Sequence, residues 1–392
     1  MLANNRWQVF LMLPATTDVL IVGAGPVGLA TAAALARDGV DVTIVDRAPT
    51  AEHTSRAAVV HARTLEVLDR IGAAGPLIAA GIPAPRFTIR DRDRTLVPIS
   101  FAGLPTRYPY ALMVPQSTTE AVLHDRLVAA GGQVHRGLEL TGLTGSTATF
   151  AGGDTVTARY VVAADGMHST VRHLTGIGFG SPADRSGGES FALADVKVDG
   201  GPPRDEVVLY FSRSGMLVWA PLPGGTVRIV AAVDDAPEQP DAAYVQSLLD
   251  SRGPARSPAR VADVVWGSRF RVHHRVADTF RSGPVLLAGD AGHVHSPAGG
   301  QGMNLGLKDA LTLADALTAA LRSGSETTLD RYAAERRPAA QAVVGFASQL
   351  TRLATVPAPL RPIRNAALST LARVPAFRLR LAQRLSGIDQ AR

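Results

Sequence analysis

One stretch near the N-terminus constrains the fold of this chain more than any other. The apolar run 18–22 leads into Gly23-Ala24-Gly25-Pro26-Val27-Gly28, then into the helical spacing of LATAAALARDG and a second apolar run that ends at Asp46. A strand, a G-x-G-x-x-G turn, a helix and a second strand ending in an acid make up a dinucleotide-binding βαβ unit. We therefore predict an α/β domain of the Rossmann type here, rather than a chance glycine-rich turn.

The glycines of this turn have separate expected tasks. Gly23 allows the tight turn, Gly25 lets a pyrophosphate approach the backbone, and Gly28 lets the helix and strand pack closely. The start of the helix offers free N–H groups and a partial positive charge to the phosphates. Asp46 is placed to accept hydrogen bonds from the ribose hydroxyls. The pattern does not say which dinucleotide is bound.

Two later segments carry a similar signature. RYVVAADGMHSTVR, residues 159–172, is a buried-strand pattern that runs into Asp165-Gly166. VLLAGDAGHVHSPAGGQGMN, residues 285–304, is another, with Gly289-Asp290 at the strand end and helical spacing from residue 299 onward. A single Gly-Asp pair is a common turn. Three such strand ends around one sheet predict a shared site.

These segments, in this order, resemble the fingerprints of the single-component (group A) FAD-dependent aromatic hydroxylases. Their fold is that of para-hydroxybenzoate hydroxylase, and the pattern is closest to the aromatic polyketide hydroxylases. Residues 55–72 and 115–127 fit two lesser segments of the family, and the likeness covers about residues 17–388. Close relatives often continue into a thioredoxin-like domain after a segment like RLAQRLSGIDQ, where this chain stops.

The resemblance implies a cofactor, FAD, and a set of residues around it. The FAD contacts would come from Gly23, Gly25, Gly28, Asp46, Arg47, Arg56, Gln116, Asp165, Gly166, Asp290, Gly302, Met303 and Asn304. Pro297, Gly299 and Gly300 would form the catalytic loop against the isoalloxazine ring. The next helix start would face the flavin N1/C2 carbonyl, where its dipole stabilises the negative charge of a reduced flavin. Gly292 stands where the family usually has the second alanine of GDAAH.

The resemblance also implies a reaction. NADH or NADPH would reduce the flavin, and a flavin C4a-hydroperoxide would transfer oxygen from dioxygen to an electron-rich aromatic substrate. Alternatives are a same-fold oxidoreductase that does not hydroxylate, such as a prenyl reductase, and a non-catalytic flavin-binding protein. The W-x-W-x-I-P signature of flavin halogenases is absent. A yellow protein that NAD(P)H bleaches would distinguish an enzyme from a non-catalytic protein.

One apolar segment predicts the class of substrate. Leu222, in VWAPLPGG, aligns where hydroxybenzoate hydroxylases carry the arginine that anchors a carboxylate. We therefore predict a large, neutral, hydrophobic phenol, with Tyr210, Trp219 and Arg228 as candidate substrate contacts. If a small benzoate were the substrate, Arg213 or Arg228 would be the anchor.

The motifs divide the chain into three regions. Alternating apolar patterns between the second and third fingerprints predict an inserted antiparallel β-sheet. The final region is helical and rich in arginine, broken at Pro357, Pro359, Pro362 and Pro375, and its arginines favour a solvated face over a membrane surface. The expected regions are an FAD-binding domain (16–84, 105–178 and 278–335), a substrate domain (85–104 and 179–277) and a C-terminal helical segment (336–392).

Composition excludes several other functions. The chain has no cysteine, and His273, His274, His293 and His295 lack spaced carboxylate partners, so we expect no metal site. The net charge is +6, but without a lysine/arginine run we expect no nucleic-acid partner. The N-terminus has too short an apolar run for a signal peptide, and we predict no membrane span. We expect a cytoplasmic enzyme, monomeric or homodimeric, whose partners are an aromatic substrate and dioxygen.

Overall fold

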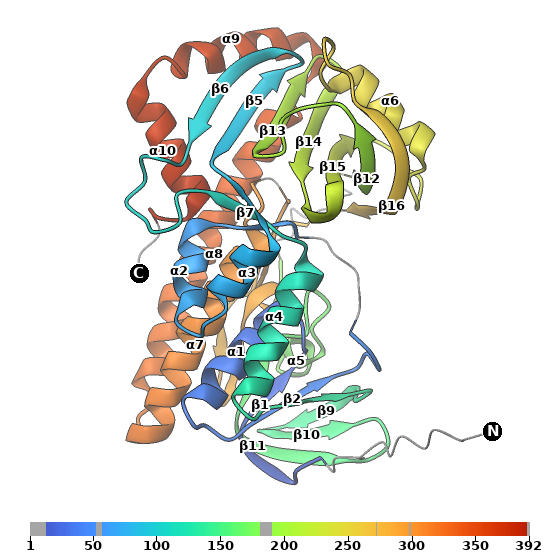
Figure 1. Cartoon of the computed structure of the whole chain (residues 1–392). Coiled ribbons are helices and arrows are strands. Elements are labelled where there is room, and N and C mark those ends of the chain that lie inside the picture. The colour runs from blue at the N-terminus through green and yellow to red at the C-terminus, as the bar shows by residue number, and fades with distance from the viewer. Residues whose placement is uncertain (1–12, 52–56, 181–189, 272, 298, 390–392) are drawn as a thin grey trace, which may run out of the picture.

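The computed structural model describes residues 13–51, 57–180, 190–271, 273–297 and 299–389. Figure 1 shows two parts, each built on its own sheet, with the long helix α8 running from one part into the other. An eight-stranded sheet lies in the lower part and a seven-stranded sheet in the upper part. Among the described residues, no helix has both the length and the apolar character needed to cross a membrane.

The eight-stranded sheet has a parallel centre. Its order is β18-β19-β11-β1-β2-β8, with β9 and β10 attached beside β11, and every neighbouring pair from β19 to β8 is parallel. The strands are β1 (Thr16–Val22), β2 (Val42–Asp46), β8 (Val134–Arg136), β9 (Leu140–Thr144), β10 (Thr147–Phe150), β11 (Thr155–Ala163), β18 (Arg281–Ser282) and β19 (Val285–Leu287). Parallel strands end at the same edge, so the ends of β1, β11 and β19 meet there, as the sequence predicted.

Helix α1 packs on this sheet against β1 and β2, and α4 and α7 pack on α1. Close approach of α1, α7 and the turn after β19 depends on small residues: a Cβ at Gly306 of α7 would lie 2.7 Å from Cγ2 of Val27 and 3.2 Å from Cα of Gly289. The expected helix after Gly299 begins at Gly302. The elements of this part are α1 (Pro26–Arg37), α2 (Ala62–Asp69), α3 (Ala74–Ala80), α4 (Gln116–Ala129), α5 (Thr170–Leu174), α7 (Gly302–Ser323), η3 (Gly289–Ala291), and the short strands β3 (Val59–Val60), β4 (Ile82–Ala84), β7 (Ala111–Met113), β17 (Arg275–Val276) and β20 (His293–Val294).

The seven-stranded sheet has the order β16-β12-β15-β14-β13-β5-β6. All neighbouring pairs are antiparallel, as predicted, except β13 and β5, which are parallel. These two strands are separated by a long stretch of chain, so no hairpin forces them to be antiparallel. The strands are β5 (Arg86–Asp91), β6 (Arg94–Ser100), β12 (Ser190–Asp199), β13 (Glu206–Ser212), β14 (Gly215–Pro221), β15 (Thr226–Val233) and β16 (Arg260–Arg271).

Both faces of this second sheet are covered. Helix α6 (Ala242–Arg252) packs on one face, where Val245, Leu248 and Leu249 join the apolar side chains of the strands. The other face packs on residues of α8, α9 and α10 and, near β13 and β14, on Ala58, Ala84 and Met113 of the lower part. The short helix η2 (Pro223–Gly225) turns the chain between β14 and β15.

The C-terminal region is helical and interrupted at prolines, as predicted. It consists of α8 (Thr327–Ala354), η4 (Ala358–Leu360), α9 (Arg361–Leu371) and α10 (Pro375–Ser386). Helix α8 continues through Pro338, so the expected boundary between residues 335 and 336 falls inside one continuous helix. Helix α8 ends instead at Ala354, shortly before Pro357.

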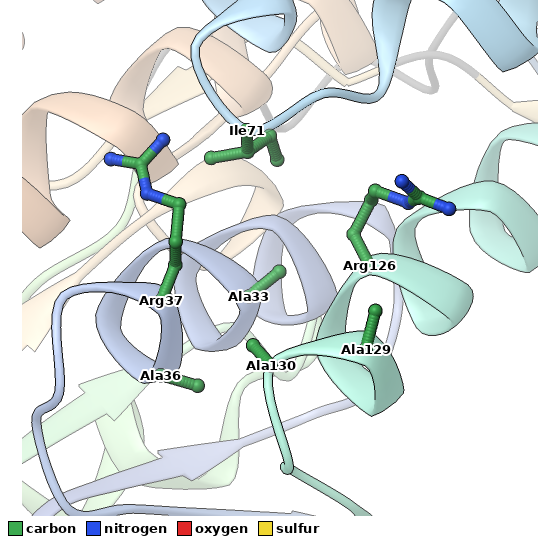
Figure 2. Close-up of a pocket in the computed structure, with 7 residues that line it drawn as sticks. All are labelled: Ala33, Ala36, Arg37, Ile71, Arg126, Ala129 and Ala130. Atoms are coloured by element: carbon green, nitrogen blue, oxygen red, sulfur yellow. The ribbon is translucent and has the colours of Figure 1, made fainter.

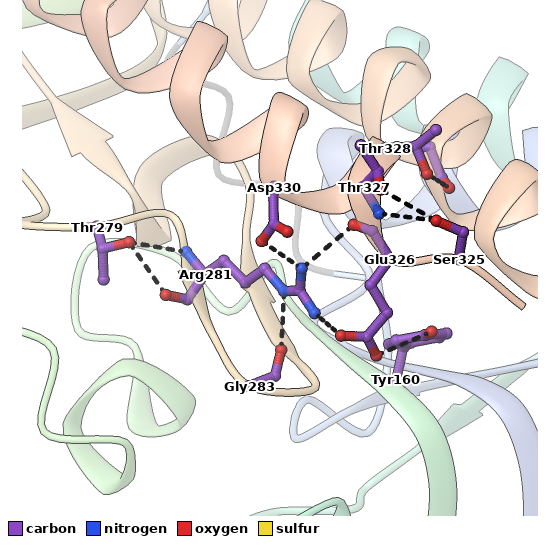
Figure 3. A network of polar contacts seen from close by, with 10 residues as sticks. Tyr160, Thr279, Arg281, Gly283, Ser325, Glu326, Thr327, Thr328 and Asp330 are labelled. Atoms are coloured by element: carbon purple, nitrogen blue, oxygen red, sulfur yellow. Dashed lines mark hydrogen bonds and ion pairs between the residues drawn. The ribbon is translucent and has the colours of Figure 1, made fainter.

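A polar network on the sheet edge fixes where α8 begins (Figure 3). Nη1 of Arg281 pairs with Oδ1 of Asp330 at 2.6 Å, and its Nη2 pairs with Glu326. The hydroxyl of Tyr160 donates to Oε1 of Glu326 at 3.3 Å. The side chains of Glu326 and Asp330 are 54% and 74% exposed, so solvent screens these pairs. We assign them a role in orienting α8 rather than in stability.

Candidate active site

The first glycine turn is shaped by backbone contacts. Gly23 has φ +104°, and a Cβ there would lie 2.4 Å from the carbonyl oxygen of Ala164 at the end of β11. A Cβ at Gly28 would lie 1.9 Å from the oxygen of Gly23. A Cβ at Gly25 would meet no described atom within 4 Å. Packing therefore requires glycine at positions 23 and 28, whereas Gly25 borders open space at the start of α1.

This open space fits a pyrophosphate. No side chain caps the start of α1, and Pro26 has no N–H, so the first N–H groups that the helix can offer to the space above Gly25 are those of Val27 and Gly28. Asp46 lies beside the turn: its Oδ2 accepts from the N–H of Ala24 at 2.6 Å and its Oδ1 from that of Ala48 at 2.8 Å. A carboxylate has about four acceptor positions. Asp46 thus keeps acceptor capacity for a ribose while it also holds the turn.

The second strand end supplies an incompletely satisfied acid. Oδ2 of Asp165 accepts from the N–H of Val171 at 3.1 Å, whereas Oδ1 is buried and has no hydrogen-bond partner among the described residues. Burial raises the pKa of Asp165, although the surrounding N–H groups and Ser169 oppose the shift. The next residue, Gly166, has φ +82° and needs the glycine backbone. An unpaired buried oxygen at this edge fits a hydroxyl or N–H donor of a bound dinucleotide.

Arg172 joins the second strand end to the third, and the sequence did not identify it. Its Nη1 donates to the carbonyl oxygen of Ala291 at 2.8 Å and its Nη2 to that of Met167 at 2.8 Å. The guanidinium lies 3.7 Å from the ring centroid of Phe179. The planar, always charged guanidinium suits two carbonyls and a ring at once.

Asp309 anchors the third strand end from behind. Its Oδ2 accepts from the N–H of Gly289 at 3.3 Å and contacts Nε2 of His293 at 2.6 Å, and its Oδ1 pairs with Nε of Arg336 at 2.7 Å. Burial alone would raise the pKa of Asp309, but Arg336 and His293 reverse the effect and lower it. Asp290, predicted as an FAD contact, is exposed on the turn that this network holds.

The loop expected to face the isoalloxazine ring is held through the carbonyl of Gly299. Nε2 of His61 donates to this oxygen at 2.9 Å, and Nε2 of Gln301 donates to it at 3.2 Å. Gln301 also donates to the carbonyl of Leu385 in α10 at 3.0 Å. Burial lowers the pKa of His61 to about 4, so the imidazole is neutral at physiological pH.

Asn304 ties the same loop to β3. Its Oδ1 accepts from the N–H of His61 at 2.8 Å, and its Nδ2 donates to the carbonyls of Val59 at 2.9 Å and Gly300 at 2.7 Å. The predicted FAD contact of Asn304 is therefore restricted to its backbone. Gly299 and Gly300 have φ +80° and +63°, and a Cβ at Gly300 would lie 2.2 Å from Cγ1 of Val59.

The other predicted FAD contacts are placed as follows. Gln116, the first residue of α4, accepts from the N–H of Ala57 at 3.2 Å and donates to Glu120 at 2.9 Å. Gly302 and Met303 open α7, and Arg47 is exposed just after β2. Arg56 lies outside the described residues. Pro297 is half-buried on the loop before Gly299.

The structure corrects the expectation for Tyr210 and Trp219. Their exposed fractions are 0% and 1%, and both lie on the face of the seven-stranded sheet that α6 covers, in the cluster with Leu248 and Leu249. The FAD-binding domain packs on the opposite face. Neither side chain can therefore contact a substrate held between the two parts. Arg213, the other candidate anchor, lies in the exposed turn between β13 and β14.

Arg228 does face the FAD-binding domain, but its guanidinium is already paired. Nε and Nη2 bond to the two carboxylate oxygens of Asp195 at 2.7 and 2.8 Å, and Nη1 donates to the carbonyl of Ala57 at 3.0 Å. Only 2% of its side chain is exposed. This bidentate pair fixes the sheet against the FAD-binding domain.

Apolar side chains surround the remaining contact between the two parts. Leu222 is 2% exposed and packs with Ala220 and Val207 of the sheet against Ala58 and Met113 of the FAD-binding domain. A Cβ at Gly299 would lie 3.4 Å from both Leu350 of α8 and Leu385 of α10. Aliphatic side chains therefore border Gly299 on the side of α8 and α10.

One groove lies elsewhere on the surface. Figure 2 shows Ala33, Ala36 and Arg37 of α1 opposite Arg126 and Ala129 of α4. These residues belong to the C-terminal parts of the two helices, away from the glycine turn at the start of α1. We therefore do not assign this groove to the active site.

Three glycine-bearing strand ends at one edge of a parallel sheet, with a second sheet packed against the same part of the chain, define a two-domain protein with a dinucleotide-binding site. The family described as FAD binding domain matches residues 16–347 of the chain. The chain belongs to this family and, with its relatives, to the single-component flavoprotein aromatic hydroxylases.

Two relatives from sequence comparison illustrate this placement. A 6-methylpretetramide 4-monooxygenase of Streptomyces rimosus is 39% identical over 88% of this chain, which spans 62% of the length of that relative. A flavin-dependent monooxygenase of Mycobacteroides abscessus is 36% identical over 85% of this chain and 74% of its own length. The chain thus spans less than two thirds of the first of these relatives.

Solved structures agree with the fold. The OxyS anhydrotetracycline hydroxylase from Streptomyces rimosus superimposes with a TM-score of 0.78 at 34% identity, over 95% of this chain and 76% of its own. The p-nitrophenol 4-monooxygenase PnpA from Pseudomonas putida gives a TM-score of 0.83 at 26% identity, over 97% of this chain and all of its own (100%). The predicted Rossmann-like fold with an inserted sheet and C-terminal helices is confirmed.

Proposed function

We propose that this protein is an FAD-dependent monooxygenase that uses NADH or NADPH and dioxygen to hydroxylate a large, neutral aromatic substrate. The observation that carries the proposal is the open space at Gly25, next to the unpaired Oδ1 of Asp165, at the edge where three strand ends meet. When bound, FAD supplies redox chemistry with dioxygen that side chains cannot perform. The absence of cysteine is compatible with a cytoplasmic enzyme.

The residues of the flavin-facing loop would set the position of the ring. His61 and Gln301 hold the carbonyl of Gly299, and Asn304 holds that of Gly300, so this backbone cannot rotate freely. The neighbouring start of α7 directs its N–H groups and partial positive charge at the loop, which favours an anionic group there. The aliphatic residues Leu350 and Leu385 beside Gly299 would exclude water from the reacting substrate.

The preference for a neutral substrate follows from the same geometry. A carboxylate buried without a partner costs several kcal/mol, and Arg228, the cation on the facing sheet, is already bound to Asp195 through two hydrogen bonds. Leu222 and Ala220, buried at the same contact, are aliphatic and offer no partner to a carboxylate, whereas each CH₂ that a larger substrate buries contributes about 0.8 kcal/mol. The names of the relatives include both polycyclic and simple phenolic substrates, such as 6-methylpretetramide and pentachlorophenol, and support an aromatic substrate without fixing its size.

Oxygen incorporation tests this function against a reductase of the same fold. With a suitable phenol, the FAD-loaded protein should oxidise NAD(P)H, consume dioxygen and place one labelled oxygen atom from ¹⁸O₂ into the product. Flavin absorbance titrations should show tighter binding of polycyclic phenols than of hydroxybenzoates. Product that forms in the absence of air, or an unlabelled hydroxyl group, would reject the monooxygenase and leave the reductase.

A further inference from the structure

Helix α9 buries two polar side chains together with Leu368 and leaves large apolar side chains outside. Arg364, Asn365 and Leu368 are 7%, 4% and 6% exposed, whereas Ile363 and Leu371 are 67% and 47% exposed. Surface helices of globular proteins normally turn polar rather than large apolar residues to solvent. The exposed apolar side chains of α9 are a feature of the chain that the proposed function does not explain.

The buried polar residues hold this orientation firmly. The guanidinium of Arg364 donates to the carbonyls of Leu353 at 3.1 Å and Phe211 at 3.0 Å, and it lies 4.5 Å from the ring centroid of Phe211. Nδ2 of Asn365 donates to Oδ2 of Asp91 at 3.0 Å and to the carbonyl of Phe211 at 3.1 Å. Helix α9 therefore cannot roll to bury Ile363 without breaking these bonds.

The exposed face is continuous along the helix. Ile363, Ala366, Ala367, Thr370 and Leu371 are all exposed and follow the i, i+3, i+4, i+7, i+8 spacing of one helical face. Large apolar side chains continue this surface on either side of α9 and onto α10. Together the exposed large apolar residues of this region are Leu360, Ile363, Leu371, Val374 and Leu379; elsewhere in the described chain only Val128, Leu174 and Val265 are comparable. We call these five residues the C-terminal apolar surface.

Positive charge surrounds this surface. From residue 336 to residue 388 the chain contains no aspartate or glutamate, although acids are common elsewhere. Arg373 and Arg380 are exposed beside the C-terminal apolar surface, and Arg352 and Arg384 are exposed on the adjoining helices. Figure 1 places α9 at the outer end of the molecule, beyond β5 and β6, whereas α10 runs beside β6 toward the middle of the molecule.

Contrary to the expectation from the sequence, and because of the exposed apolar residues, we propose that the C-terminal apolar surface docks on an anionic lipid bilayer, with α9 lying in the interface and the neighbouring arginines on lipid headgroups. An apolar helix face flanked by arginines is the pattern of a helix that lies on a membrane rather than through it. A second copy of the chain is a poorer occupant, because a self-complementary contact would bring together two copies of a surface whose neighbouring charges are all positive. Exposed apolar patches of this kind mark interaction sites.

Vesicle sedimentation tests the proposal on the whole FAD-loaded protein. Binding should occur to vesicles that contain phosphatidylglycerol and not to phosphatidylcholine alone, and it should weaken as salt is raised. The double variant Ile363→Asp/Leu371→Asp should lose binding, whereas Val128→Asp, at an equally exposed position (52%) on α4, should not. Arg373→Glu/Arg380→Glu should weaken binding at least about fivefold for each arginine, whereas Arg204→Glu/Arg331→Glu, also at exposed sites, should have a smaller effect.

Light scattering without lipid tests whether a second copy of the chain, rather than a bilayer, covers the C-terminal apolar surface. The proposal predicts one molecular mass for wild type and Ile363→Asp/Leu371→Asp. The proposal is overturned if the wild-type protein binds neither kind of vesicle, or if Ile363→Asp/Leu371→Asp binds vesicles as tightly as the wild type. It is also overturned if the wild type self-associates and this variant does not. It is equally overturned if a protein partner, and no vesicle, binds in a manner that Ile363→Asp abolishes. Flavin absorbance of each variant verifies that the fold is retained.

Discussion

The contrast between Gly25 and Gly28 gives the sharpest test of the FAD site. A valine at position 25 would place its side chain in the open space at the start of α1, and the extended backbone there (φ −76°, ψ −175°) accepts a β-branched residue. Gly25→Val should therefore leave the apoprotein as stable as wild type and block FAD. An alanine at position 28 would lie 1.9 Å from the oxygen of Gly23 and must displace backbone.

The magnitudes follow from the contacts. A hydrogen bond to a charged group is worth about 1.5–3 kcal/mol, so losing two N–H bonds to the pyrophosphate should weaken FAD binding by about 3–6 kcal/mol, or roughly 10²- to 10⁴-fold. Gly28→Ala should destabilise the apoprotein by at least about 2 kcal/mol. Gly75→Ala, at an exposed helical glycine with no described atom within 4 Å, should instead stabilise by about 0.5–1 kcal/mol.

Two assays on the same samples test whether the open space at Gly25 binds the FAD phosphates. Quenching of FAD fluorescence gives the dissociation constant of each apoprotein, and urea unfolding gives its stability. If Gly25→Val binds FAD as tightly as wild type, the phosphates do not approach this backbone. If Gly25→Val and Gly28→Ala lose stability equally, the open space at Gly25 is not a ligand site.

Two further predictions concern buried groups. Asp309→Asn removes the charge that Arg336 and His293 contact, and leaving a buried charge unpaired costs about 3–5 kcal/mol. Urea unfolding should show a loss of stability of this size. The control Asp315→Asn, whose ion pair with Arg70 is about half exposed, should change stability by less than about 1 kcal/mol. Equal losses would show that Asp309 does not anchor the turn. The pKa of His61 is lowered from 6.5 to about 4, so the unfolded chain binds more protons than the native state between these values, and the contribution of His61 to stability is complete above pH 6.5 and lost as pH falls toward 4. On going from pH 7.5 to 5, His61→Gln should lose about 2 kcal/mol less than wild type in urea unfolding, and an identical loss would refute the neutral, buried imidazole.

The parts of the fold that could be predicted from the sequence are those that local sequence patterns specify. The strand ends at Gly23, Asp165 and Gly289 each follow an apolar run, and parallel pairing brings such ends to one edge whatever their distance in sequence. The four consecutive apolar patterns β12 to β15 likewise gave antiparallel strands correctly. The parallel pair β13–β5 and the continuity of α8 through Pro338 depend on tertiary contacts and had no local signal.

The substrate side of the site was less predictable for a physical reason. Both faces of the seven-stranded sheet are apolar, so alternation along β13 and β14 shows that two faces exist but not which one meets the FAD-binding domain. Tyr210 and Trp219 were therefore predicted as substrate contacts, although they lie on the face that α6 covers. His61, Arg172 and Asp309 were missed because each acts on a carbonyl or an N–H from a distant segment, which no residue spacing reveals.

The order of strands in the eight-stranded sheet also determines when the molecule can be completed. Strand β1 lies between β2, its neighbour in sequence, and β11, with Thr16 paired to Thr157, and β11 in turn waits for β19, with Val161 paired to Val285. During synthesis, β1 therefore has no partner on its second edge until β11 has been made, more than a third of the way along these 392 residues. Such non-local parallel pairing folds slowly and leaves apolar strand edges exposed in the meantime. The predicted FAD contact Asp290 follows β19 directly, so bound FAD would stabilise the chain only once β19 has joined the sheet.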